Sequence, residues 1–321
     1  MKINKFHTIG GAALLNPKCN IWLKASKILP KILLYLVMLG LAYIFLYPFL
    51  YMVITSVKSN ADLNNPLVMW IPRSIHLGNY SLASTIMNYW NNLKNTVLVT
   101  ALATLGQLIS CSMAGYSLAR YNSFGHKFAF FFMILAMLVP PQTIIVPQYL
   151  LYANMGWLNT YFPLTIPAFF GFGLKGALFI YIFRQFFLSQ PRELEEAARV
   201  DGCGFIRTFL YIVFPVARSI YIVVLVLALV WHWSDFFEPS MYINKSDMAM
   251  LSMRLQAISD TLRLFSADVL ETNYGVTDTN TINNAVLMAG TFIVVLPVLL
   301  IYALLQKQFI QGIERSGLTG E

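Results

Sequence analysis

The side chains best able to do chemistry are concentrated in one short stretch of an otherwise apolar chain. Between Glu195 and Ser219, the string EEAARVDGCGFIRTFLYIVFPVARS holds three acids, three arginines, two glycines and a proline. Such a set can form ion pairs or bind a charged partner surface, whereas proton-transfer catalysis needs convergent acids and bases. The four histidines are scattered, and no HExxH string occurs. We therefore expect a recognition site and no catalytic or metal-binding residue.

Nucleotide-binding motifs are weak or missing. The string GFGLKG at Gly171–Gly176 spells GxGxxG, but it does not follow a strand in a βαβ unit, so we read it as loosening a helix. No GxxxxGK[ST] string occurs, so the chain is not expected to hold any cofactor. Three cysteines with no framework spacing are expected to be reduced and structural: Cys19, Cys111 and Cys203.

The elements that must position this stretch are membrane helices. The chain of 321 residues is 58% hydrophobic and only 11% charged, and about 20 apolar residues suffice to span a bilayer. The first apolar segment is too long to be the core of a cleavable signal. The fold class is therefore expected to be all-α integral membrane, with six transmembrane helices. The expected spans are 32–56, 95–119, 128–152, 162–187, 216–236 and 284–306.

The distribution of basic residues predicts the orientation of these spans. The net charge of +8 could suggest nucleic acid, but most of the 22 basic residues fall in the tails and in alternate loops. Because basic residues collect on the cytoplasmic side, both termini and the charged stretch should be cytoplasmic, with no nucleic-acid partner and with lipid around the spans. This gives cytoplasmic tails at 1–31 and 308–321, a transmembrane domain at 32–307, and an external loop at 238–283.

The charged stretch, within a loop at 189–214, has the local signals of two short helices. Pro191 and the following acids suit a helix start, Arg199 can pair with Glu195, and Gly202 suits the left-handed residue that ends a helix. A helix of about ten residues is marginal alone and should be stabilised by docking. A second helix is expected at 205–214, ending at Pro215. The alternative is an amphipathic loop lying at the lipid headgroups.

A family resemblance favours docking. Glu196-Ala197-Ala198, followed by Asp201-Gly202 and by Pro215, is similar to the "EAA" loop of ABC importer permeases. In that family the loop between the fourth and fifth spans is the coupling helix, which docks in a cleft of the cytoplasmic ATPase. The resemblance assigns ATPase coupling to Glu195, Glu196, Ala197, Ala198, Asp201, Gly202, Phe209 and Pro215.

Further motifs resemble the maltose-type, carbohydrate branch of these permeases. They are LGNYS at Leu77, AGYSLARYNSFG at Ala114, MGWLNTY at Met155, FRQFFLSQPRELEEAARVDG at Phe183 and WHWSDFFEP at Trp231. The sequence departs from the family pattern at Cys203-Gly204 and at His232.

The resemblance implies half of a translocation pathway in the bacterial cell membrane. The implied partners are a second, related permease, two copies of an ATPase and an extracytoplasmic solute-binding protein. The alternatives are another solute, such as glycerol phosphate or a peptide, or a polytopic membrane enzyme.

Several residues are candidates for the solute pathway. A cation near a membrane span is a functional candidate by default, although Lys175 could also snorkel to the interface or pair inside the bundle. Prolines in the third span could line the pathway or only kink the helix. The tryptophans of WHWSDFFEP could line it or anchor the chain at the membrane interface. The pathway candidates are Lys175, Pro140, Pro147, Trp231 and Trp233.

The external loop contains one amphipathic pattern. Apolar residues follow helical spacing, and Ser246 could cap the start of the helix. In the maltose-type family this loop reaches toward the solute-binding protein, and the alternative is a helix lying flat on the membrane. The candidate contacts are Leu251, Leu255, Ile258 and Leu262, with Phe265 continuing the face.

Overall fold

The computed structural model describes residues 17–173, 175–264 and 283–315, and every regular element in these ranges is a helix. Residues 1–53 and 54–321 form two separate units. The first unit consists, in its described part, of most of α1 (Pro17–Ser56). The apolar stretch Leu29–Ser56 of this helix has the length and hydropathy of a membrane span. The expected first span at 32–56 lies within it.

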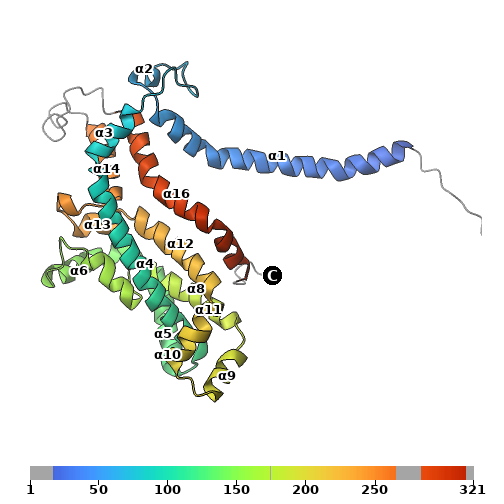
Figure 1. The fold of residues 1–321 in the computed structure, drawn as a ribbon, viewed down its shortest axis with the longest axis vertical. Coiled ribbons are helices and arrows are strands. Elements are labelled where there is room, and N and C mark those ends of the chain that lie inside the picture. Colours follow the sequence, from blue (N-terminus) through green and yellow to red (C-terminus); the bar gives the residue numbers. More distant parts are fainter. Residues whose placement is uncertain (1–16, 174, 265–282, 316–321) are drawn as a thin grey trace, which may run out of the picture. The chain divides into compact units, whose positions relative to one another are not determined.

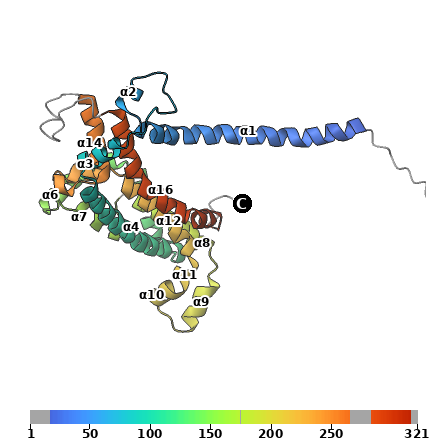
Figure 2. The same cartoon turned by 45° about the horizontal axis from the view of Figure 1, so that its top comes forward.

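The second unit is built around the long helix α4 (Tyr89–Arg120). In Figures 1 and 2 this helix runs past α12 (Arg218–Ser234) and α8 (Gly176–Ser189), and α16 (Asn284–Arg315) lies beside α12. Gly115 lets α4 and α8 approach closely, because a Cβ at this position would lie 2.7 Å from the Cβ of Phe183. Small residues at helix contacts are the usual means of tight packing in membranes.

The third expected span, 128–152, is divided into two helices. α5 (Phe124–Leu138) and α6 (Pro141–Asn154) meet at an angle of 103°. Pro140 and Pro141 explain the break, since proline lacks the backbone donor and disfavours a helical residue before it. Pro147, by contrast, sits inside α6. Because of this bend, α5 and α6 do not form one continuous straight helix.

The fourth expected span, 162–187, is interrupted at the GxGxxG string. α7 (Phe162–Thr165) and the 3₁₀ segment η1 (Ile166–Phe170) precede the break, and α8 follows it. Gly171, Gly173 and Lys175 all have positive φ angles. α8 alone has 14 residues, about 21 Å at 1.5 Å per residue, which is shorter than the bilayer core.

The fifth expected span, 216–236, contains a bend of 81° near its start, between Val216 and Arg218. Upstream of it lie α9 (Glu193–Val200), α10 (Phe205–Thr208), the π-helical segment η2 (Phe209–Val213) and α11 (Phe214–Val216). The second helix expected at 205–214 is therefore a composite that continues through Pro215. Within the described residues, three helices can cross a membrane alone, and up to five spans result if each bent pair counts as one.

The remaining elements gather near the N-terminal end of α4 (Figure 1). They are α2 (Asn60–Leu63), α3 (Gly78–Ile86), α13 (Phe237–Tyr242), η3 (Ser246–Met248) and α14 (Leu251–Leu264). Ser246 begins η3, whereas α14 starts at Leu251, so Ser246 does not cap α14 as expected. Leu251 and Ile258 are buried in a core shared with α3 and α16.

Candidate functional site

The helix α9 ends in a hydrogen-bonding pattern that requires Gly202. The amide of Cys203 donates to the carbonyl of Ala198 at 2.9 Å, and the amide of Gly202 donates to that of Arg199 at 3.0 Å. This pair of bonds is the Schellman motif, whose central residue is left-handed. Gly202 has φ +80°, which confirms the left-handed conformation expected from the sequence. The helix runs over eight residues, close to the expected ten.

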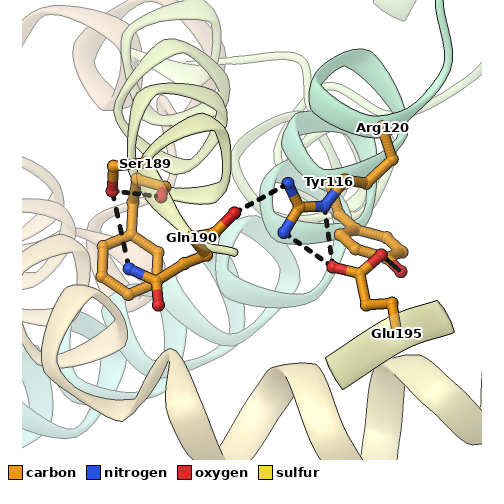
Figure 3. Close-up of polar contacts among 6 residues, drawn as sticks. Tyr116, Arg120, Ser189, Gln190 and Glu195 are labelled. Carbon is orange, nitrogen blue, oxygen red and sulfur yellow. Dashed lines mark hydrogen bonds and ion pairs between the residues drawn. The ribbon is translucent and has the colours of Figure 1, made fainter. Parts of the chain in front are cut away.

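One face of α9 is turned into the protein. Ala198 is 3% exposed and Glu195 is 5% exposed, although Glu195 carries a charge. A buried carboxylate is costly unless it is paired and hydrogen-bonded. Figure 3 shows the pairing, in which Arg120 and Tyr116 of α4 both point at Glu195. Glu195 therefore pairs across the protein and not with Arg199, the partner that helical spacing predicted.

The other face of α9 is open. Glu196, Ala197 and Asp201 are exposed, and the apolar side chains of Leu194 and Val200 are 52% and 89% exposed. The acids of the first turn suit the positive end of the helix dipole. An outward face that combines small, apolar and acidic residues has the composition of a recognition surface.

The structure divides the residues proposed for ATPase coupling into two groups. Glu196, Ala197 and Asp201 lie on the outward face, and Gly202 ends the helix in the open. Glu195 and Ala198 face inward, and Phe209 is buried in the aromatic core below α9. Pro215 is exposed in α11. The inward group can shape α9 but cannot touch a partner in this conformation.

A second site lies at the bend between α5 and α6. Two cavities of about 290 and 600 Å³ share lining residues there, including Lys175, Pro141 and Glu238. The larger one is also lined by Trp231 and Asp235. The ammonium of Lys175 lies 4.6 Å from the centre of the Trp231 ring, a cation–π contact. Lys175 is an exposed residue whose ammonium nevertheless contacts the ring of a neighbouring helix.

The acids of this cavity are close to the end of α12. Burial, followed by the nearby carboxylate of Asp235, raises the pKa of Glu238 to about 7. Glu238 can therefore both donate and accept hydrogen bonds near neutral pH. A ring of aromatic, amide and carboxyl groups around a cavity of several hundred Å³ is suited to a small polar ligand.

The pathway candidates from the sequence do not all reach this cavity. Lys175, Pro140 and Trp231 line it. Pro147 lies within α6 and is not among the residues that line the two cavities. Trp233 is buried on the other side of α12, where its indole donates to the carbonyl of Val294 at 3.0 Å. The structure thus brings three of the five candidates together.

The helix α14, which was expected in the external loop, turns its apolar face inward. Leu251 is fully buried, Ile258 is 1% exposed, and Leu255 packs against the same core. Of the other two residues on this face, nothing is described for the side chain of Leu262, and Phe265 lies outside the described residues. Leu251, Leu255 and Ile258 therefore hold α14 on its neighbours in the same protein. A contact of α14 with a partner would have to be made by other residues.

Sequence reasoning missed four residues that define these sites. Arg120 and Tyr116 lie in the quoted AGYSLARYNSFG string, and Asp235 and Glu238 lie in WHWSDFFEP. The available signal was a charged residue at the edge of a span, which is costly without a partner. Among the described residues, no cluster of three or more His, Cys, Asp or Glu could hold a metal ion.

Comparisons with known proteins identify the family to which the chain belongs. The model of the family described as "Binding-protein-dependent transport system inner membrane component" matches residues 108–315. An arabinooligosaccharides transport system permease protein of Halalkalibacterium halodurans is 26% identical and covers 87% of this chain and 93% of its own length. A probable ABC transporter permease protein of Pyrococcus horikoshii is 31% identical, with 85% and 92% covered.

Two further similarities concern sugar transport. A melibiose/raffinose/stachyose import permease protein of Bacillus subtilis is 28% identical over 85% of this chain and 91% of its own. The crystal structure of a bacterial ABC transporter that imports the acidic polysaccharide alginate contains a chain with a TM-score of 0.73 and 22% identity. The match covers 88% of this chain and 98% of that one, so the fold is shared over nearly the whole length.

Proposed function

Since the chain belongs to the family of binding-protein-dependent transport system inner membrane components, we propose that it is the permease subunit of an ATP-driven carbohydrate importer. The chain itself is a transporter component and not an enzyme. The observation that carries the proposal is the open face of α9, with exposed Glu196, Ala197 and Val200. This face is the surface through which a separate ATPase, with its own ATP and Mg²⁺, would grip the permease.

Carbohydrate is favoured as the solute on two grounds. The relatives named above include permeases for arabinooligosaccharides and for melibiose, raffinose and stachyose. The cavity at the α5–α6 bend offers the Trp231 ring for stacking, with Asp235 and Glu238 for hydroxyl groups. The described lining holds one ammonium and two carboxyl groups, a balance that disfavours glycerol phosphate or another anion.

The same proposal fixes the arrangement in the membrane. Six spans with cytoplasmic termini in a bacterial cell membrane place α9 inside and α14 outside. A second, related permease would complete the pathway, two ATPase copies would bind inside, and a solute-binding protein would deliver the solute outside. Single cysteines at Arg207 and Lys245, in a background without native cysteines, test the orientation with an impermeant thiol reagent. Labelling of position 207 in intact cells would refute it.

The docking role of α9 is tested by replacing Val200. Val200→Glu puts a charge on the most exposed apolar residue of the helix and should reduce the amount of ATPase retained on the purified permease by about tenfold. Val200→Thr has nearly the same shape and should stay within about twofold. Equal retention of ATPase by both variants would contradict docking through this face.

The solute class is tested by deleting the gene and measuring uptake. The proposal predicts that uptake of an oligosaccharide is lost and that a copy of the gene restores it. Loss of peptide or glycerol phosphate uptake with unchanged sugar uptake would instead assign the chain to another solute.

A further inference from the structure

The contacts at the C-terminal end of α4 identify residues that position the coupling helix. We propose that Arg120 and Tyr116 clamp Glu195, so that movement of α9 on the ATPase is carried by α4 to the external segment 247–251. This inference rests on the proposed docking of α9, and it adds the route by which docking is transmitted. Both clamp residues act through Glu195 and need no contact with solute or nucleotide.

The clamp engages both oxygens of the Glu195 carboxylate (Figure 3). From the guanidinium of Arg120, Nε and Nη2 each reach Oε1 at 2.7 Å, and the hydroxyl of Tyr116 donates to Oε2 at 2.8 Å. Nη1 of the same guanidinium donates to the carbonyl of Gln190 at 3.2 Å, just before α9 begins. The side chains of Arg120 and Glu195 are only 4% and 6% exposed. Each of the three guanidinium nitrogens is therefore engaged, away from water.

Tyr116 also joins the segments that flank α9. Its ring lies 5.4 Å from that of Phe187 in α8, 5.4 Å from Phe205 in α10 and 5.3 Å from Phe209 in η2. The chain before α9 and the chain after it thus pack on the same side chain of α4. A displacement of α9 must either break these buried contacts or move the end of α4 with it.

The other end of α4 holds the external segment. The side-chain amide of Asn95 donates to the backbone carbonyls of Asp247 at 2.8 Å and Ala249 at 3.0 Å. The hydroxyl of Thr96 accepts from the amide of Leu251, at the start of α14, at 2.9 Å. These residues sit about two turns from the N-terminus of α4.

Between its ends, α4 is one unbroken helix of 32 residues, about 48 Å long at 1.5 Å per residue. α4 contains no proline, whereas α16, the other described helix of 32 residues in the same unit, has Pro297 inside it. Near its middle, Gln107 is hydrogen-bonded at 2.9 Å to His232, the neighbour of the cavity residue Trp231. A single stiff element therefore contacts the coupling helix, the cavity wall and the external segment, which is the contiguous physical connection that coupling between distant sites can use.

The test uses the whole importer, purified from its native membrane with its ATPase, partner permease and binding protein. Glu195→Gln keeps the shape of the side chain and removes its charge. Arg120→Lys keeps the positive charge and removes the planar guanidinium with its several N–H donors. We expect the stimulation of ATPase activity by solute-loaded binding protein to fall about tenfold in the first variant and about threefold in the second. The amount of ATPase retained per permease should stay within twofold. Lys127→Gln, an exposed change at the start of α5, is the control and should alter nothing.

This readout distinguishes the clamp from a merely structural role. A structural role would lower the amount of permease or the ATPase retained on it, and the remaining complex would still be stimulated normally. Normal stimulation in Glu195→Gln would overturn the proposal. If that variant does not accumulate, Tyr116→Phe keeps the packed ring, and it must lower stimulation about twofold or more for the clamp to stand. A wild-type chain that retains no ATPase would overturn both the clamp and the proposed function, whereas wild-type retention with unaffected variants overturns the clamp alone.

Discussion

The two ends of α4 hold their neighbours by different chemistry. At the C-terminal end, the charged Arg120 and the phenol of Tyr116 bind one specific carboxylate, that of Glu195. At the N-terminal end, the neutral side chains of Asn95 and Thr96 bind backbone groups of the external segment. The first contact recognises a particular side chain, whereas the second holds the path of the backbone whatever its side chains are.

This difference predicts unequal sensitivity to substitution. Charge-assisted hydrogen bonds are roughly twice as strong as neutral ones, and removal of one partner of a buried ion pair leaves the other charge uncompensated. A neutral contact to backbone can be replaced in part by water at the half-exposed N-terminal end. The C-terminal end of α4 should therefore be the fragile end, and the N-terminal end the tolerant one.

The largest effect is expected from Arg120→Leu. This change leaves Glu195 buried without its cation and should lower the free energy of unfolding by about 3–5 kcal/mol. An SDS-unfolding titration of the purified permease measures it. The double variant Arg120→Leu with Glu195→Leu should recover most of the lost unfolding free energy, because no uncompensated charge is left buried. A single variant as stable as wild type would contradict the comparison.

A smaller loss is expected where α4 meets α8. Gly115→Ala would place a Cβ 2.7 Å from the Cβ of Phe183 and 2.9 Å from the amide nitrogen of Arg184. Overpacking of this kind costs about 1–3 kcal/mol of unfolding free energy in the same titration. Gly125→Ala is the matched control, since the nearest atom to its new Cβ is the hydroxyl of Ser123 at 3.9 Å. Equal effects of the two changes would mean that α4 and α8 are not packed this closely.

A local effect is expected at the end of α9. Gly202 has φ +80°, where a residue with a Cβ is disfavoured by about 1–2 kcal/mol, so Gly202→Ala should fray the helix. Hydrogen exchange of the amides in 193–203 should become about tenfold faster, which is the rate equivalent of 1.4 kcal/mol. At Gly204 the φ angle is −71° and the surroundings are open, so Gly204→Ala should leave exchange unchanged. Unchanged exchange in Gly202→Ala would rule out the glycine-dependent helix end.

The smallest effect is expected at the N-terminal end of α4. Asn95→Ala removes two hydrogen bonds to backbone carbonyls that water can reach, and it should lower the unfolding free energy by only about 1 kcal/mol. Lys94→Gln, an exposed neighbour, should stay within about 0.5 kcal/mol of wild type. A loss at Asn95 as large as that at Arg120 would remove the contrast between the two ends of α4.

Local features of the fold were accessible from the sequence, and distant pairings were not. The left-handed conformation of Gly202 follows from the backbone preferences of a few neighbouring residues, and so does the helix break at GFGLKG. The pairing of Glu195 with Arg120, 75 positions away, depends on how α9 folds back on α4, and helical spacing pointed to Arg199 instead. The inward direction of Ala198 has the same origin.

The apolar pattern of α14 shows another limit. The spacing of Leu251, Leu255 and Ile258 correctly indicated a helix with one apolar face. Periodicity does not say what covers such a face, and in the structure α16 and α3 cover it. Likewise, Trp231 and Trp233 are two positions apart on α12, so the helical rotation sends one to the cavity and the other to the core.

The most direct test of the connection through α4 is hydrogen exchange at its external end in the complete importer. The amide of Leu251 is bonded to Thr96, so peptides covering 247–255 report on the external contact. Binding of a non-hydrolysable ATP analogue to the ATPase should change the exchange of these peptides in the wild type. In Glu195→Gln, with the ATPase retained, the change should disappear. The same nucleotide-dependent change in both proteins would contradict a route through Glu195 and α4.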